Sequence, residues 1–408
     1  MGADIGKVVI VGAGHAGGSA AAFLRQFGFR GEIVLIGDEP LAPYQRPPLS
    51  KAWLKGEADG ESLLLRPESF YAEENIALRL GVRVQRIDRA AREVVLEDGE
   101  RLSFDALILA TGSTARKLPV PGADDPRVLE LRDAADADRL KAALKPGTRL
   151  VIVGAGYVGL EVAASARALG CEAVVVEREA RVLARVATPE LSAFFEAYHA
   201  SKGVEIITGA QAVAIEDAST VRLADGRAIS GDVVLVGVGG AACEALAVSA
   251  GLTCDGGVLV DEACRTADEA IWAIGDCARR PIGLYGQSLR LESVPNALES
   301  AKRAASAIAG RPLPAPEVPW FWSDQYELKL QIAGVGLSPD RIVTRGDPAS
   351  AAFAVFQLKD GAIQAVEAVN APAEFMGGRQ MIARGVLVDA DRLADDSVPM
   401  KALLTPAN

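Results

Sequence analysis

Two glycine-rich loops, each directly after an apolar segment, constrain the fold of this chain more than any other feature. The loop GAGHAG at 12–17 follows the apolar segment 7–11, and the loop GAGYVG at 154–159 follows 150–153. In such a loop the first glycine makes a tight turn, the second lets the backbone approach a pyrophosphate, and the third lets helix pack on strand. The start of the following helix adds the positive end of a dipole. We therefore predict two strand–loop–helix–strand units that each bind a dinucleotide.

An acidic residue follows the second strand of each unit, Asp38 in the first and Glu177 in the second. Each is placed to accept hydrogen bonds from the ribose of a bound adenosine, although either is also acceptable as a solvated loop residue. A carboxylate at position 177 repels the extra phosphate of NADPH, whereas Arg178 beside it is able to pair with that phosphate. Because a chain with two dinucleotide sites most simply passes electrons between them, the pattern predicts an oxidoreductase that uses FAD and NAD.

Two further segments fit a flavin site. Ala110-Thr111-Gly112 and Gly275-Asp276 each end a short apolar segment with small residues, which let the backbone run close to a ligand. The acid at 276 is suited to bind a sugar-alcohol hydroxyl. Lys51 follows a rigid proline-rich segment, and a cation near the flavin would stabilise negative charge on the reduced ring, although a surface lysine is the commoner case.

Composition excludes several classes of protein. The 408 residues include 43 basic and 54 acidic ones, a formal charge of −11, which argues against a nucleic-acid-binding protein or one bound to anionic membranes. Five cysteines without a CxxC pair and only two histidines predict no disulfide framework and no metal site. The segment 38–65 contains no cysteine, which argues against disulfide reductases and cysteine-dependent peroxidases. No segment has the pattern of a signal peptide or a membrane span, so we expect a cytoplasmic location.

The order of these segments predicts the fold class and the domains. We expect an α/β protein with two Rossmann-like dinucleotide-binding domains, arranged as in glutathione reductase, and a C-terminal mixed α/β domain. The FAD-binding domain is expected to be discontinuous, at 1–112 and 246–318, with the NAD-binding domain at 113–245. Four prolines at 312–319 form a linker to the C-terminal domain at 319–408.

Five motifs together give the chain a resemblance to a known family. They are PPLSK at 47–51, GAGYVGLE at 154–161, GDC at 275–277, ESVPNA at 292–297 and WFWSDQY at 320–326. With these motifs the chain resembles, over nearly its whole length, the NADH-dependent reductases of 2Fe–2S ferredoxins, of the putidaredoxin reductase type that serves oxygenases. Relatives usually carry Pro-Asn or Pro-Thr shortly after the glycines at 237 and 239, where this chain has Ala241-Ala-Cys243.

The resemblance implies residues for both cofactors and a role for two of them. Lys51 and Glu161 are implied as catalytic residues that meet near the flavin N5 when the domains close. For FAD it implies Gly12, Gly14, Ala16, Asp38, Lys51, Val84, Arg132, Asp276 and Val294. The full set expected for FAD adds Gly17, Arg46, Ala110, Thr111, Gly112, Gly275 and Trp322. For NADH it implies Gly156, Tyr157, Gly159, Glu161, Glu177, Arg185 and Gly239, and the full set adds Gly154, Val158 and Arg178.

The implied activity is electron transfer from NADH through FAD to a 2Fe–2S ferredoxin that serves a cytochrome P-450 or a Rieske-type oxygenase. A reductase of rubredoxin or of a small organic radical is the alternative, and a flavoprotein interaction module is disfavoured by the acidic charge. Trp320 and Trp322 are either core aromatics or the wall of an electron exit. Lys302, Arg303 and Arg66 are candidates for a basic docking patch, with a solvated helix face as the plain alternative.

Overall fold

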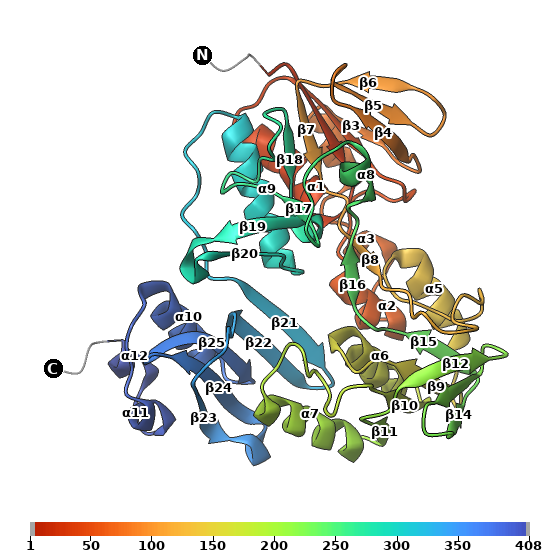
Figure 1. Ribbon diagram of the computed structural model, residues 1–408, viewed down its shortest axis with the longest axis vertical. Coiled ribbons are helices and arrows are strands. Elements are labelled where there is room, and N and C mark those ends of the chain that lie inside the picture. Colours follow the sequence, from red (N-terminus) through yellow and green to blue (C-terminus); the bar gives the residue numbers. More distant parts are fainter. Residues whose placement is uncertain (1–4, 405–408) are drawn as a thin grey trace. The chain divides into compact units, whose positions relative to one another are not determined.

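The computed structural model describes residues 5–404 and divides the chain into two compact units. The first unit combines the chain up to Arg46 with Asp59–Thr114 and Gly240–Glu317. The second unit combines Pro47–Ala58 with Ala115–Gly239 and the chain from Val318 onward. Each unit is therefore assembled from segments far apart in the sequence (Figure 1).

A five-stranded parallel sheet organises the first unit, in the order β18-β7-β1-β2-β3. The central strand β1 is fully apolar after Lys7, as expected for a parallel strand that is covered on both faces. Helices α1 and α9 pack against each other beside this sheet (Figure 1). The sheet strands and these helices are β1 (Lys7–Val11), α1 (His15–Gln26), β2 (Glu32–Ile36), β3 (Ile76–Arg79), β7 (Ala106–Leu109), β18 (Ile271–Ala273) and α9 (Val294–Ile308).

Strand β18 pairs with β7 although more than 160 positions separate them, so the chain returns to the first unit after the second dinucleotide segment. Smaller sheets and short helices complete the unit. They are α3 (Gly60–Leu63), α4 (Glu68–Glu73), β4 (Val84–Asp88), β5 (Glu93–Leu96), β6 (Arg101–Ser103), β8 (Ser113–Ala115), β16 (Gly240–Ala242), α8 (Ala245–Ser249), β17 (Val258–Leu259), η2 (Gly275–Cys277), β19 (Ala278–Ile282), η3 (Gly283–Tyr285) and β20 (Gln287–Leu289).

The second unit contains a four-stranded parallel sheet in the order β11-β10-β9-β15, with helix α6 after the second glycine loop. Short antiparallel strands and helices flank it. The elements of this part are η1 (Pro47–Ser50), α2 (Ala52–Lys55), α5 (Ala134–Ala143), β9 (Arg149–Val153), α6 (Tyr157–Ala168), β10 (Glu172–Val176), α7 (Pro189–Ser201), β11 (Val204–Ile207), β12 (Ala212–Glu216), β13 (Thr220–Leu223), β14 (Ala228–Ser230) and β15 (Val233–Val236).

The C-terminal part of the second unit is a five-stranded antiparallel sheet in the order β21-β22-β25-β24-β23. Its core is continuous with that of the parallel sheet, since Leu160, Phe195, Leu330 and Phe353 belong to one buried cluster. This part comprises β21 (Trp320–Gln325), β22 (Leu328–Gly334), β23 (Arg341–Asp347), η4 (Pro348–Ser350), β24 (Ala352–Lys359), β25 (Ala362–Val369), α10 (Pro372–Arg384), α11 (Ala390–Ala394) and α12 (Met400–Leu403).

The structure confirms the predicted α/β class, with a parallel sheet around each glycine loop and a mixed C-terminal part. The compact units, however, divide the chain differently from the three predicted domains. The segment Pro47–Ala58, expected within 1–112, groups with the second unit, as does the chain from Val318 onward. Leu54 shows the reason, because it is buried in the same apolar cluster as Leu140 of α5 and Leu160 of α6.

Candidate functional site

The two glycine loops have the same local geometry. Gly12 and Gly154 take φ angles of +111° and +112°, and a Cβ on either would lie within 2.5 Å of a backbone oxygen. The third glycines are equally constrained, because a Cβ on Gly17 or Gly159 would meet the oxygen of the first glycine at 1.9 or 2.2 Å. A Cβ on Gly14 or Gly156 meets nothing within 4 Å. The middle glycine of each loop therefore faces open space at a helix N-terminus, which fits a pyrophosphate.

The acid of the second dinucleotide unit is bound to its own loop. Glu177 accepts hydrogen bonds from the backbone N–H groups of Ala155 (2.7 Å) and Glu179 (2.8 Å), which fixes its carboxylate beside the turn. Arg178 is exposed, and its guanidinium pairs with Glu179.

The acid of the first unit is less constrained, because Asp38 is exposed and forms an ion pair with Arg83 at 3.2 Å. His15, inside the first loop, has a buried Nδ1 with no hydrogen-bond partner among the described residues. Burial, with a smaller contribution from the nearby Arg66, lowers its pKa to about 4, so the imidazole is neutral at pH 7. A buried polar atom without a partner beside an open glycine loop fits the binding of a polar group such as the FAD pyrophosphate.

The small-residue turns of the first unit are joined by polar contacts. Ser113 donates a hydrogen bond to Asp276 at 2.9 Å, and Thr111 donates to the carbonyl of Cys243 at 2.7 Å. Gly275 has a φ of +70°, and its N–H donates to Ser300 on α9. These contacts join the predicted segments 110–112 and 275–276 to each other and to Ser300 in the middle of α9, the helix that begins at Val294.

The other residues predicted for FAD divide between the two units. The second unit contains three of them, Lys51, Arg132 and Trp322. The first unit contains the others, which are Gly12, Gly14, Ala16, Gly17, Asp38, Arg46, Val84, Ala110, Thr111, Gly112, Gly275, Asp276 and Val294. Arg46 forms an ion pair with Glu39 at 2.6 Å. Trp322 is half-buried, with its ring centroid 5.6 Å from that of Trp320, so neither tryptophan is a fully buried core residue.

All residues predicted for NAD lie in the second unit. The second loop and the first turns of α6 contain Gly154, Gly156, Tyr157, Val158, Gly159 and Glu161. The later part of the unit contains Glu177, Arg178, Arg185 and Gly239. Gly239 has a φ of +107°, and a Cβ there would lie 3.0 Å from the guanidinium of Arg185. The Tyr157 ring packs on Phe321 of β21, and burial raises the pKa of its hydroxyl.

Lys51 and Glu161 form a direct ion pair in the second unit. The Lys51 ammonium lies 2.6 Å from the Glu161 carboxylate, whose side chain is 5% exposed. The same carboxylate accepts hydrogen bonds from Ser50 (2.5 Å) and from Ser323 on β21 (2.6 Å). The structure therefore joins the two predicted catalytic residues to each other. Sequence reasoning missed both serines, although Ser50 lies inside the PPLSK motif.

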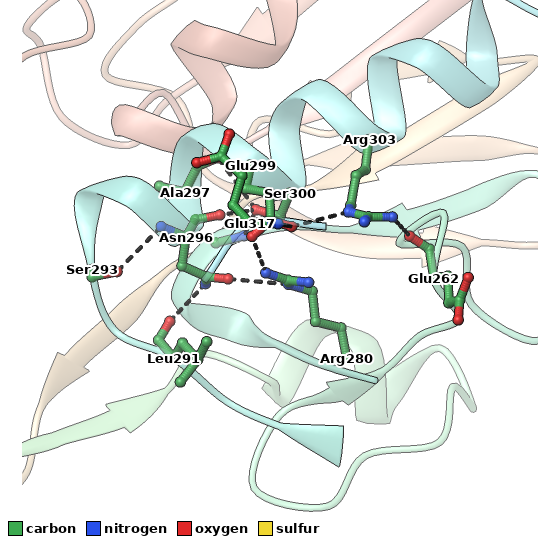
Figure 2. A network of polar contacts seen from close by, with 11 residues as sticks. Glu262, Arg280, Leu291, Ser293, Asn296, Ala297, Glu299, Ser300, Arg303 and Glu317 are labelled. Atoms are coloured by element: carbon green, nitrogen blue, oxygen red, sulfur yellow. Dashed lines mark hydrogen bonds and ion pairs between the residues drawn. The ribbon is translucent and has the colours of Figure 1, made fainter. Parts of the chain in front are cut away.

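The predicted basic docking patch is wrong in one of its residues. Arg303 is buried, with a side chain 6% exposed that pairs with Glu299 and donates to the carbonyl of Glu262 (Figure 2). Helix α9 presents this position to the protein interior, so Arg303 is not a surface residue. Lys302 is exposed, whereas Arg66 is half-buried with its guanidinium over the Phe70 ring.

Glu367 is a buried acid that sequence reasoning also missed. It lies on β25, is 1% exposed, and accepts hydrogen bonds from the N–H and hydroxyl of Thr188 at the start of α7. Gln357 donates to it as well. Burial raises its pKa from 4.5 to about 7, so the carboxyl titrates near neutral pH. No periodicity or motif in the sequence indicates this contact.

We expect Glu367→Gln to be more stable than the parent at alkaline pH. Because the folded-state pKa is raised, the protonated Glu367 contributes stability that is fully present below about pH 4.5. This contribution is lost as the pH rises through about 7. Glutamine keeps the shape without the charge, so the variant should gain about 2–3 kcal/mol at about pH 8 and little near pH 4.5. Urea unfolding at both pH values measures this. The exposed Glu97→Gln serves as the control, and an equal effect of Glu367→Gln at both pH values would contradict the assignment.

The described part of the chain contains neither the pattern of a metal site nor that of a membrane-spanning helix. Residues 5–404 place no group of three or more His, Cys, Asp or Glu side chains together as metal ligands. Within the same range, every helix is too short or too polar to cross a membrane. All five cysteines are free thiols.

Comparison with known proteins identifies the family of the chain. Residues 6–301 match the family model described as pyridine nucleotide-disulphide oxidoreductase, and residues 320–404 match the reductase C-terminal family. The chain is 49% identical over 402 residues to the probable ferredoxin reductase CtmF of Castellaniella defragrans, covering 97% of this chain and 98% of that protein. It is 41% identical to putidaredoxin reductase CamA of Pseudomonas putida, covering 98% and 97% of the two chains.

A solved structure gives the same result in three dimensions. The fold superimposes on the reductase in the crystal structure of the covalent putidaredoxin reductase–putidaredoxin complex with a TM-score of 0.95. The two chains share 41% sequence identity, and the match covers 98% of each. With matching sequence over nearly its whole length, this chain belongs to the pyridine nucleotide-disulphide oxidoreductase family and carries that family's reductase C-terminal domain.

Proposed function

We propose that the protein is an FAD-dependent NADH:ferredoxin oxidoreductase whose 2Fe–2S ferredoxin serves a cytochrome P-450 or a Rieske-type oxygenase. The observation that carries the proposal is the pair of glycine loops, each open at its middle glycine, in a chain 49% identical to a probable ferredoxin reductase. When bound at these loops, FAD would supply two-electron acceptance from NADH and release of single electrons, which is chemistry that side chains do not provide. The partner is inferred from relatives named as reductases of putidaredoxin and of a p-cumate dioxygenase system.

Each group of residues has a stated task in this proposal. The first loop, with Asp276 and the segment 110–112, binds FAD, and the second loop, with Glu177 and Arg185, binds NADH. Lys51 supplies a positive charge next to the flavin, which stabilises the negative charge that reduction places on the ring. Glu161 forms an ion pair with Lys51 and thereby orients its ammonium group. Trp320 and Trp322 wall the route by which electrons leave.

Cysteine chemistry has no place in this mechanism. Disulfide reductases need a cysteine beside the flavin, and the segment 38–65 contains none. The buried thiols Cys264 and Cys277 have pKa values raised by burial, which disfavours the reactive thiolate. The family name therefore describes ancestry of the fold, and the acceptor that we propose is an iron–sulfur protein.

The most direct test is reduction of cytochrome c by NADH with purified 2Fe–2S ferredoxins added one at a time. We expect a rate that depends on one ferredoxin and saturates with its concentration. Rubredoxin and a small organic radical are assayed in parallel, because they represent the alternative acceptors. A ferredoxin-independent rate, or saturation with rubredoxin alone, would contradict the proposed partner.

Glu177 is expected to set the preference for NADH. Its carboxylate is fixed beside the second loop, where it would face the additional phosphate of NADPH, which carries a charge of about −2. Glu177→Ala should reduce the ratio of kcat/KM for NADH over NADPH by about tenfold, the effect of removing one like-charge contact. Glu172→Ala, at an exposed position of β10, serves as the control. Equal use of both nucleotides by the parent protein would rule out the role of Glu177.

We also propose three functional domains and a cytoplasmic location. One domain, formed by residues 1–112 and 246–318, binds FAD. A second domain, residues 113–245, binds NADH, and a third, residues 319–408, docks the acceptor. Limited proteolysis near 312–319 tests the last of these limits. A reducing compartment is supported by the five free thiols and by the use of NADH.

A further inference from the structure

The ion pair of Lys51 and Glu161 is connected to a buried hydrogen-bonded chain that the proposed function does not use. Gln325 Nε2 lies 3.1 Å from the Ser323 hydroxyl, and Gln325 Oε1 lies 2.7 Å from His199 Nε2. Tyr326 reaches His199 Nδ1 at 3.5 Å. Ser323, Gln325 and His199 are each no more than 1% exposed. All of these residues belong to the second unit.

The negative charge of Glu161 sets the direction of every hydrogen bond in this buried series. The Glu161 carboxylate accepts hydrogen bonds only, so the Ser323 hydroxyl must donate its one proton to it. The Ser323 oxygen then accepts from Gln325 Nε2, which leaves Gln325 Oε1 to accept from His199. His199 therefore carries its proton on Nε2 and accepts from Tyr326 at Nδ1. Burial lowers the pKa of His199, which agrees with a neutral ring in this arrangement.

Strand β21 is what brings these donors to Glu161. Its side chains alternate, so Trp320 and Trp322 lie on one face and Ser323 and Gln325 on the other. The same strand thus carries the tryptophans of the proposed electron exit and the buried donors to Glu161. Within the described C-terminal segment, Ser323 is the residue that donates a hydrogen bond to Glu161.

We infer that Ser323 is a positioning residue for the reduction of the flavin by NADH. Through Ser323 the C-terminal segment takes part in hydride transfer as well as in acceptor docking. Ser323 holds the ionised Glu161 so that the carboxylate fixes the Lys51 ammonium, and Gln325 and His199 hold Ser323 in its donating orientation. The inference rests on the proposed function, because it assigns Lys51 and Glu161 to the flavin. The charged and titratable groups that face Glu161 are Lys51 and Tyr157. His199 and Tyr326 lie farther along the series of hydrogen bonds.

The first test needs neither cofactor turnover nor a partner. The sequence has two histidines, His15 and His199, so ¹⁵N NMR of histidine-labelled holoprotein resolves them after assignment with His15→Gln. We expect His199 in the Nε2–H form in the parent, and a mixture of tautomers in Ser323→Ala and Glu161→Gln. An Nδ1–H form in the parent would overturn the orientation, as would an unchanged tautomer in both variants.

The second test follows flavin reduction by NADH in stopped flow. Ser323→Ala removes one of the donors to Glu161, so the limiting rate should fall roughly tenfold while the apparent Kd for NADH stays the same. Ser323→Thr keeps the hydroxyl and should restore the limiting rate. In a Glu161→Gln background, Ser323→Ala should have no further effect.

Ser165 provides the matched control. Its hydroxyl is buried on the same helix as Glu161, one turn further on, and donates to the carbonyl of Ser50 at 2.6 Å without contacting the carboxylate. Ser165→Ala should leave the limiting rate and the His199 tautomer unchanged, and an equal loss of rate with an equal change of tautomer in both serine variants would overturn the inference. Failure of NADH to reduce the flavin of the parent would instead contradict the proposed function.

Discussion

Replacing Glu299 by alanine should lower the free energy of unfolding of the first unit by about 3–5 kcal/mol, because it leaves two buried arginines facing each other. Glu299 on α9 pairs with Arg280 of β19 and with Arg303 one turn further on (Figure 2). All three side chains are at most 7% exposed. Arg280 also donates to Asn296 at 3.2 Å, which ties β19 to the first turn of the helix.

Urea unfolding followed by flavin fluorescence measures this loss, since the proposed FAD site lies in the same unit. Glu299→Gln keeps the shape but not the charge, and should lose less than alanine. Glu93→Ala is the matched control, because its ion pair with Arg101 is on the surface and should contribute at most about 1 kcal/mol. If the two alanine variants lose the same stability, the buried cluster does not hold the unit together.

Replacing Lys51 by methionine should slow flavin reduction by NADH by about a hundredfold while FAD remains bound. The change removes the cation proposed to stabilise the reduced ring, a charge effect of roughly 3 kcal/mol. It also leaves the buried Glu161 with two hydroxyl donors and no positive partner. Single-turnover stopped flow gives the rate, and the visible flavin spectrum gives the FAD content.

Lys55→Met is the control for this prediction, since Lys55 lies one turn away on α2 and pairs with the exposed Glu57. It should leave the rate unchanged. Lys51→Arg keeps the charge with a different geometry and should fall between the parent and the methionine variant. An unchanged rate in Lys51→Met would make Lys51 a structural partner of Glu161 with no part in reduction.

The sequence by itself determined the local units of this protein. The strand–loop–helix–strand pattern predicted β1, α1 and β2, and again β9, α6 and β10, because glycine turns and apolar periodicity act over a few residues. The sequence also identified Lys51 and Glu161, although through resemblance to a family and not through spacing.

Only the tertiary structure decided what surrounds those residues. Ser323 is 162 positions from Glu161, and nothing local to either residue signals their hydrogen bond. Arg303 looks like an exposed helix charge in the sequence, yet α9 turns it towards Glu299 and the interior. Glu367 titrates near neutral pH because the fold buries its carboxyl, although Thr188 at the start of α7 donates hydrogen bonds that lower the pKa. Sequence patterns report the conformation of neighbouring residues, whereas the burial and partners of a charge depend on which distant segments pack together.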